Sequence, residues 1–207
     1  FIASGNFATS IDASNFGVSD NGTDALFTNA GTFRKSGSTD INITTVGITF
    51  NNTGTVDVQT GSLNLSSGGT HTGNFTGSTG IINFAGGSHL LQAGSSITTQ
   101  NANFSGSGTT TINGTYNVAG STGISGGSAS INGTLTSLGS SLTIFGGLLN
   151  LNASNASVTS LTQIGGSLAG TGNLTVTGAS TITSGDHRGT GTTILQGPST
   201  ISSSGFR

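Results

Sequence analysis

Residues able to carry out acid–base or metal chemistry are few in this sequence and lie far apart. The chain of 207 residues has 6 acidic residues, 3 His and no Cys. Hydrolysis of polysaccharides requires two carboxyl groups on one face, but no acidic residue lies between Asp57 and Asp186. Within that interval the only titratable side chains besides Tyr116 are His71 and His89. We therefore expect no enzyme activity and no cofactor.

The densest polar cluster is Asp186-His187-Arg188, near the C-terminal end. These side chains are candidates for a ligand contact or a subunit contact, and a solvated loop is the alternative. Asp20 and Asp24 flank an Asn-Gly turn and form a weak calcium candidate, because the full twelve-residue calcium loop with its terminal Glu is absent. A plain Asx-rich turn is the alternative there.

Charged residues make up only 5% of the chain, and the net charge is −2. This balance provides no basic surface for nucleic acid or for anionic membranes. No apolar run approaches the roughly 18 residues of a membrane-spanning helix. Arg34 and Lys35 are the only adjacent basic pair, and we expect them to protect a strand edge. A surface of Ser, Thr and Asn with few trypsin sites favours an extracellular or cell-surface location.

Three ladders of mostly apolar residues run in step, each repeating every 20 positions. They are Phe84, Phe104, Ile124, Ile144 and Ile164; Leu91, Thr111, Ile131 and Leu151; and Thr98, Val118, Leu138 and Val158. A fixed period of this length is typical of repeat architectures. Strong helix formers are scarce, while Thr, Val, Ile and Phe favour strands. We predict an all-β fold, a right-handed parallel β-helix (β-solenoid) with three short strands per rung of about 20 residues.

The whole chain, residues 1–207, is expected to form a single solenoid domain. Residues 50–183 form the regular rungs, and residues 184–207 form a C-terminal loop and the last rung. Residues 1–30 are an irregular segment that is a candidate for pairing with a neighbouring subunit. Asn residues at rung corners are expected to hydrogen-bond along the axis, namely Asn113, Asn132 and Asn152.

Several Gly- and Thr-rich stretches resemble repeats of very large bacterial surface proteins, of the autotransporter-passenger and filamentous-haemagglutinin type. The stretches are NAGTFRKSG (29–37), FNNTGTVDVQTGSLNLSSGGTHTG (50–73), INGTYNVAGSTGISGG (112–127), SLAGTGNLTVTG (167–178) and GTGTTILQG (189–197). The resemblance implies a right-handed parallel β-helix on the cell exterior that serves adhesion or scaffolding. It brings no catalytic residues with it. The first thirty residues and the Asp186-His187-Arg188 insertion depart from the pattern.

The two ends of such a solenoid are expected to expose unpaired strand edges, since neither terminus has an amphipathic helix to cover them. Apolar residues near the termini are candidates for contacts between subunits: Phe1, Ile2, Phe7, Ile201 and Phe206. The chain is then either a segment of a longer passenger or a subunit that stacks head to tail into a homo-oligomer by β-augmentation.

We favour a structural role, as a filament subunit or a rigid surface stalk. The alternative is a carbohydrate-binding adhesin module that contacts a glycan surface through Asp186–Arg188 and the aromatic-rich N-terminal region. Neither reading involves nucleic acid or membrane insertion.

Overall fold

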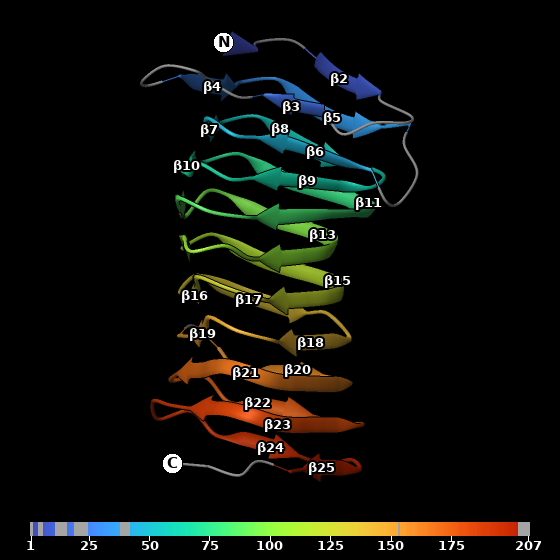
Figure 1. The fold of residues 1–207 in the computed structure, drawn as a ribbon. Coiled ribbons are helices and arrows are strands. Elements are labelled where there is room, and N and C mark those ends of the chain that lie inside the picture. Colours follow the sequence, from blue (N-terminus) through green and yellow to red (C-terminus); the bar gives the residue numbers. More distant parts are fainter. Residues whose placement is uncertain are drawn as a thin grey trace.

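The chain folds into a stack of short parallel strands. The computed structural model describes residues 2–3, 6–10, 16–18, 25–37, 42–152 and 154–202, with side chains from residue 25 onward. Every helix or strand element in these ranges is a β-strand. The strands form about 9 turns of roughly 19–20 residues each, and Figure 1 shows the turns from the N-terminal to the C-terminal end. The predicted all-β parallel solenoid is confirmed.

The strands are short, because each spans one side of a turn. In chain order they are β1 (Ile2–Ala3), β2 (Asn6–Ser10), β3 (Phe16–Val18), β4 (Leu26–Asn29), β5 (Thr32–Ser36), β6 (Ile43–Val46), β7 (Thr49–Asn52), β8 (Thr55–Val58), β9 (Ser62–Leu65), β10 (Gly69–His71), β11 (Asn74–Phe84), β12 (Ser88–Leu91), β13 (Ser96–Phe104), β14 (Thr109–Ile112), β15 (Thr115–Ile124), β16 (Ser128–Ile131), β17 (Thr134–Leu138), β18 (Ser141–Ile144), β19 (Leu148–Leu151), β20 (Ala156–Val158), β21 (Ser160–Gly170), β22 (Leu174–Val176), β23 (Ser180–His187), β24 (Thr193–Leu195) and β25 (Ser199–Ile201).

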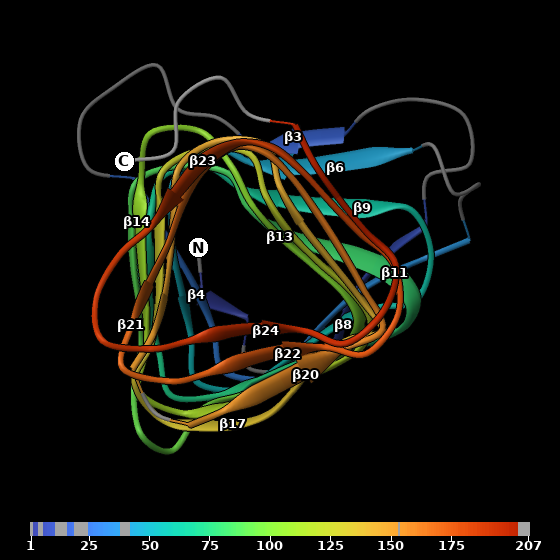
Figure 2. The ribbon, with the colours of Figure 1, turned by 90° about the horizontal axis from the view of Figure 1, so that it is seen from below.

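Three sides enclose the core, and Figure 2 shows their triangular outline from the C-terminal end. Side A holds β1, β4, β7, β10, β12, β14, β16, β19 and the second halves of β21 and β23. Side B holds β2, β5, β8, β17, β20, β22, β24 and the first halves of β11, β13 and β15. Side C holds the remaining strands and half-strands. In Figure 2 the chain runs counterclockwise while it approaches the viewer, so the solenoid is right-handed.

The first predicted ladder forms a vertical column inside the corner between sides C and A. Phe84 pairs with Phe104, Phe104 with Ile124, and Ile124 with Ile144. All four side chains are at most 2% exposed, and the two Phe rings stack with centroids 5.5 Å apart. Burial of large apolar side chains contributes about 1.5–3 kcal/mol each, so this column is a main source of stability.

The prediction is wrong for the last member of that ladder, Ile164. Ile144 pairs with Gln163, and Ile164 is 49% exposed. The turn from Ile144 to Gln163 contains 19 residues and not 20, so the strict period slips by one position. Successive strand side chains point to opposite faces, and the slip therefore turns Ile164 outward.

The second ladder also contains a slip of one residue. Leu91 pairs with Ile112, which pairs with Ile131, which pairs with Leu151. All four side chains are buried. Leu91, Ile131 and Leu151 were predicted correctly, whereas Thr111 lies on the outer face and Ile112 takes its place.

The third ladder needs a similar correction. Thr99, and not Thr98, pairs with Val118, which pairs with Leu138. Val158 is buried as expected, but it belongs to a separate three-stranded sheet, β20-β22-β24. The ladder of backbone pairs on side B is therefore interrupted between β17 and β20.

The corners need small residues and polar side chains that bond along the axis. Gly147 has a φ of 71°, and a Cβ there would lie 2.6 Å from the backbone carbonyl of Gly126, so only glycine fits. Asn132 Nδ2 donates to Asn113 Oδ1 at 3.2 Å, and Asn152 Nδ2 donates to Asn132 Oδ1 at 2.8 Å. The predicted axial Asn ladder is confirmed.

Candidate functional site: the charged loop, the buried histidines and the last turn

The cluster Asp186-His187-Arg188 lies where β23 ends, and its side chains are engaged within the chain. Arg188 Nη2 forms an ion pair with Asp186 Oδ2. His187 Nε2 lies 2.7 Å from Gln163 Oε1, and His187 Nδ1 lies 2.9 Å from Thr193 Oγ1. The adjoining cavity of about 10 Å³ has the size of one water molecule. The cluster therefore joins three strands and leaves little space for a sugar.

Gln163 is the buried residue of this hydrogen-bonded group. Its side chain lies between Ile144 and Ile182 in the pairing of β18, β21 and β23, and it is fully buried. Its Oε1 accepts a hydrogen bond from His187, but its Nε2 has no partner. Burial lowers the pKa of His187, an effect that Asp186 partly opposes, and favours the neutral ring. A strict 20-residue period places Gln163 on the outer face, beside the expected inward Ile164, so its burial was not predicted.

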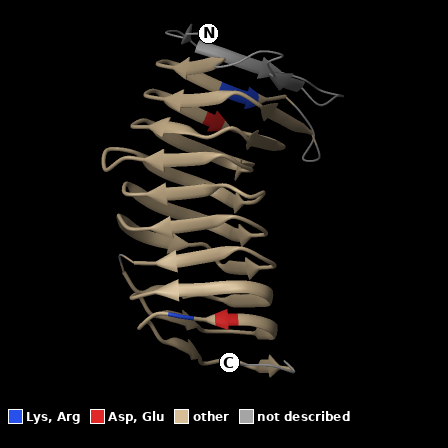
Figure 3. Cartoon of the chain, turned by 60° about the vertical axis from the view of Figure 1, so that its left-hand side comes forward, with Lys and Arg blue, Asp and Glu red and all other residues tan. Residues whose placement is uncertain are grey.

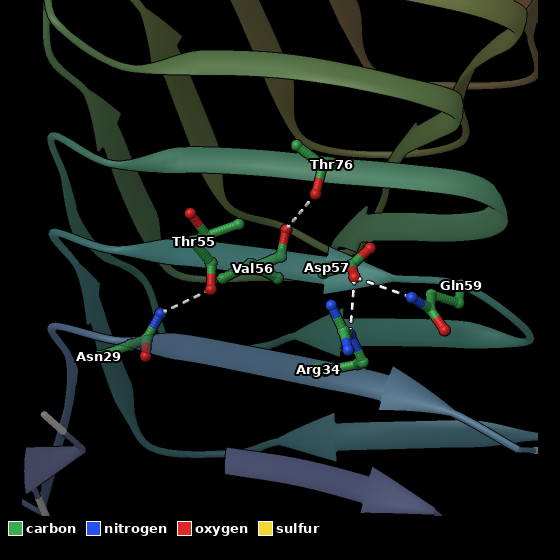
Figure 4. Close-up of polar contacts among 7 residues, drawn as sticks. All are labelled: Asn29, Arg34, Thr55, Val56, Asp57, Gln59 and Thr76. Carbon is green, nitrogen blue, oxygen red and sulfur yellow. Dashed lines mark hydrogen bonds and ion pairs between the residues drawn. The ribbon is translucent and has the colours of Figure 1, made fainter. Parts of the chain in front are cut away.

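Arg34 and Lys35 point to opposite sides of β5. Arg34 Nε lies 2.8 Å from Asp57 Oδ2 on the next turn, and Gln59 Nε2 donates to the same oxygen at 3.0 Å (Figure 4). Lys35 is buried, and burial lowers its pKa. The strand β5 pairs with both β2 and β8, so the expected protection of a sheet edge is wrong.

The charges of the described residues form two groups near the two ends of the stack. They are Arg34 and Lys35 on β5 with Asp57 on β8, and Asp186 and Arg188 around the end of β23. Figure 3 shows coloured basic and acidic residues near both ends of the stack. The turns between them carry no Lys, Arg, Asp or Glu. The outer surface of the middle turns is therefore neutral; Ser, Thr, Asn and Gly form most of it, and Leu90, Phe145 and Ile164 are exposed among them.

Two histidines form a hydrogen-bonded pair inside side A. His71 Nε2 lies 3.0 Å from His89 Nδ1, and His89 Nε2 lies 3.2 Å from the Leu65 carbonyl oxygen. A carbonyl only accepts, so His89 carries its proton on Nε2 and His71 donates from its own Nε2. Burial among rings such as Phe75 and Phe84 lowers the pKa of His71 to about 3 and that of His89 to about 4. Both rings are thus neutral near pH 7.

The contact between these histidines was not predicted. The two residues are 18 positions apart, which is close to the length of one turn. Two His residues at this spacing on inward-facing positions were the sequence signal that could have indicated a contact between them. In the sequence, His71 and His89 indicate only acid–base chemistry, for which the interval between Asp57 and Asp186 offers no carboxylate partner.

The N-terminal strands add a further turn to the stack. Ile2 on β1 pairs with Thr28, and Phe7 on β2 pairs with Phe33. β3 pairs with β6, so each side of the solenoid receives one of these three strands. The remaining N-terminal candidates and one C-terminal candidate lie outside the described residues: Phe1, Asp20, Asp24 and Phe206.

The last described turn has an open edge. Among the strands that the structure describes, β24 pairs with β22 alone and β25 pairs with β23 alone. Ile201 on β25 is 55% exposed, and Ile194 on β24 is also exposed. This turn presents unpaired backbone groups together with apolar side chains, which are the features of an edge that can accept another strand.

Comparison with protein families, with curated proteins and with solved structures finds no match to this chain. Within the described ranges no three His, Cys, Asp or Glu side chains are grouped so as to hold a metal ion. The same ranges contain no helix long and apolar enough to cross a membrane. The fold defines the class: the chain is a β-solenoid repeat protein.

Proposed function

We propose that the chain is a rigid structural module of an extracellular protein, which stacks end to end into a filament or forms a surface stalk. The observation that supports it best is the match between the two ends. The N-terminal turn consists of β1, β2 and β3, one strand on each side. The C-terminal turn ends with β23, β24 and β25, again one strand on each side.

This match supports head-to-tail β-augmentation. A following subunit can place its β1, β2 and β3 below the second half of β23, below β24 and below β25, and so continue the parallel hydrogen bonds of all three sides. Such a contact repeats without closing, and a heterologous contact that does not close produces a filament. It would also cover the inward-facing Leu195 and Ile201, whose partners on the preceding turn, Val176 and Ile182, are buried.

The extracellular location rests on other observations. The stretches quoted above resemble repeats of large bacterial surface proteins. Lys35, Arg34 and Arg188 are the only basic residues among the described ones, and the first is buried. A neutral surface with few protease sites suits a protein exposed outside the cell.

Electron microscopy and sedimentation of the purified chain test the proposal. Deletion of residues 198–206 and, separately, of residues 1–10 should each abolish filaments. Ile201→Lys should do the same by placing a charge at the contact. Ile164→Lys is the matched control, because it is an exposed Ile on the side of the stack, and it should leave filaments intact. Undiminished filaments from both deletions would refute end-to-end stacking. A monomeric parent chain would leave the stalk as the proposed role.

A further inference from the structure

A groove of about 600 Å³ lies on the outer face of side A, across the turns of β7, β10, β12 and β14. This volume is within the range of about 300–1000 Å³ that small-ligand sites occupy. The groove lies on paired strands rather than on loops, and its lining side chains therefore have a fixed spacing. Sequence analysis did not identify it.

Two consecutive glycines, Gly68 and Gly69, lie at the start of β10. The pairs Asn52–His71 and Gly69–His89 place Gly68 between Thr49 and Ser88. Gly68 has a φ of 79°, and a Cβ there would lie 2.5 Å from the Ser88 carbonyl oxygen. Gly69, which lines the groove, has a φ of 151°, and a Cβ there would lie 1.9 Å from the Phe50 carbonyl oxygen, so a side chain is excluded at both glycines.

The polar groups of the groove are already oriented. The Thr70 backbone N–H donates to Asn51 Oδ1 at 2.8 Å, which fixes the amide plane and leaves its NH₂ group as a donor. Thr109 Oγ1 donates to Ser88 Oγ at 3.3 Å. Orientation before binding reduces the entropy that a ligand contact costs. Such hydroxyl and amide groups match the hydroxyl groups of a sugar.

One apolar side chain lies among these polar groups. Leu90 is 39% exposed, and it pairs with Thr70 on one side and with Thr111 on the other. An exposed Leu flanked by hydroxyl groups offers a surface for the C–H face of a pyranose ring. None of the described residues that line the groove carries a charge. His89 is the only titratable residue among them, and its ring is buried and neutral.

We propose that this groove binds a short segment of neutral glycan, with a sugar ring on Leu90 and its hydroxyl groups bonded to Asn51 and to the Thr and Ser hydroxyls. The neutral lining argues against sulfated or uronic-acid glycans, because those need a cation that the groove does not provide. The proposal does not depend on end-to-end stacking, since the groove faces sideways.

A glycan array that contains neutral, sulfated and uronic-acid oligosaccharides, probed with the labelled full chain, tests this proposal. Calorimetry with the best neutral oligosaccharide of the array then measures the affinity of variants. Leu90→Ala and Asn51→Ala should each weaken binding by about tenfold. Ser130→Ala and Asn150→Ala are matched controls on the same side, outside the groove, and should change binding less than about twofold. Circular dichroism should be the same for all four.

Three outcomes would overturn the proposal. The first is an array without neutral hits, or with sulfated or uronic-acid hits only. The second is unchanged affinity in both groove variants. The third is a parent chain that self-associates laterally in sedimentation and loses this association in Leu90→Ala, because the occupant would then be a second copy of the chain. Failure of filament assembly in the deletion variants would leave glycan binding unaffected, so the two proposals are distinguishable.

Discussion

The imidazole rings of His71 and His89 stack in the core at 20° to each other, with Nε2 of the first 3.0 Å from Nδ1 of the second. They lie on consecutive turns, β10 and β12. Because both rings are neutral and buried, their protonation is coupled to unfolding.

Acid should destabilise the protein through this pair. The ordinary pKa of 6.5 applies to the unfolded chain, and the folded values are about 3 for His71 and about 4 for His89. Stability is fully present above pH 6.5 and decreases as pH falls toward 4, because the unfolded chain takes up protons first. At pH 5 the loss for His89 alone is about 2 kcal/mol. Melting temperatures by circular dichroism at pH 7 and pH 5 measure it. The variant with both His71 and His89 changed to Leu should lose much less stability between pH 7 and pH 5. An equal loss in this variant would contradict the assignment of the acid sensitivity to the two histidines.

The same substitution, Ile to Ala, at two positions 20 residues apart tests whether the turn between them has 19 residues or 20. Ile144 is fully buried in the column, whereas Ile164 is exposed. Ile144→Ala should lower the free energy of unfolding by about 2–5 kcal/mol, since it leaves a cavity. Ile164→Ala should cost less than about 1 kcal/mol. Urea denaturation followed by circular dichroism measures both, and similar costs at the two positions would contradict the observed pairing of Ile144 with Gln163.

Gln163→Leu should stabilise the chain. The substitution removes the buried Nε2 that has no partner and restores an apolar side chain between Ile144 and Ile182. His187 loses one hydrogen bond, but it is exposed enough to bond with water. The free energy of unfolding should rise by about 1 kcal/mol. A decrease measured by urea denaturation would mean that the bond between Gln163 and His187 outweighs the unpaired amide.

Trypsin should cut the folded chain slowly. Among the described Lys and Arg residues, cleavage should occur first after Arg188. Arg34 and Lys35 lie on β5, which is paired on both edges, whereas Arg188 follows the last residue of β23 and is well exposed. Cleavage requires local opening of the backbone, which is easiest outside paired strands. Mass spectrometry of timed digests identifies the sites. The heat-denatured chain is the control and should be cut at all three residues; early cleavage at Lys35 in the folded chain would contradict the pairing of β5.

The fold class was readable from the sequence because its determinants are local and repeated. Apolar residues alternate within each strand and return after 20 positions, as in Phe84, Phe104 and Ile124, and glycine or Asn marks the corners. These signals depend only on strand geometry and turn chemistry, so they predicted the parallel strands, most of the core columns and the axial Asn ladder.

Tertiary structure decided the features that depend on the exact length of each turn. A turn of 19 or 21 residues moves the pairing by one position, and one position exchanges the inner for the outer face. The exposure of Ile164, the burial of Ile112 and Thr99 in place of their neighbours, and the burial of Gln163 follow from such slips. The pairing of His71 with His89 and the groove around Leu90 arise only when side chains from separate turns are brought together, because no single stretch of sequence contains them.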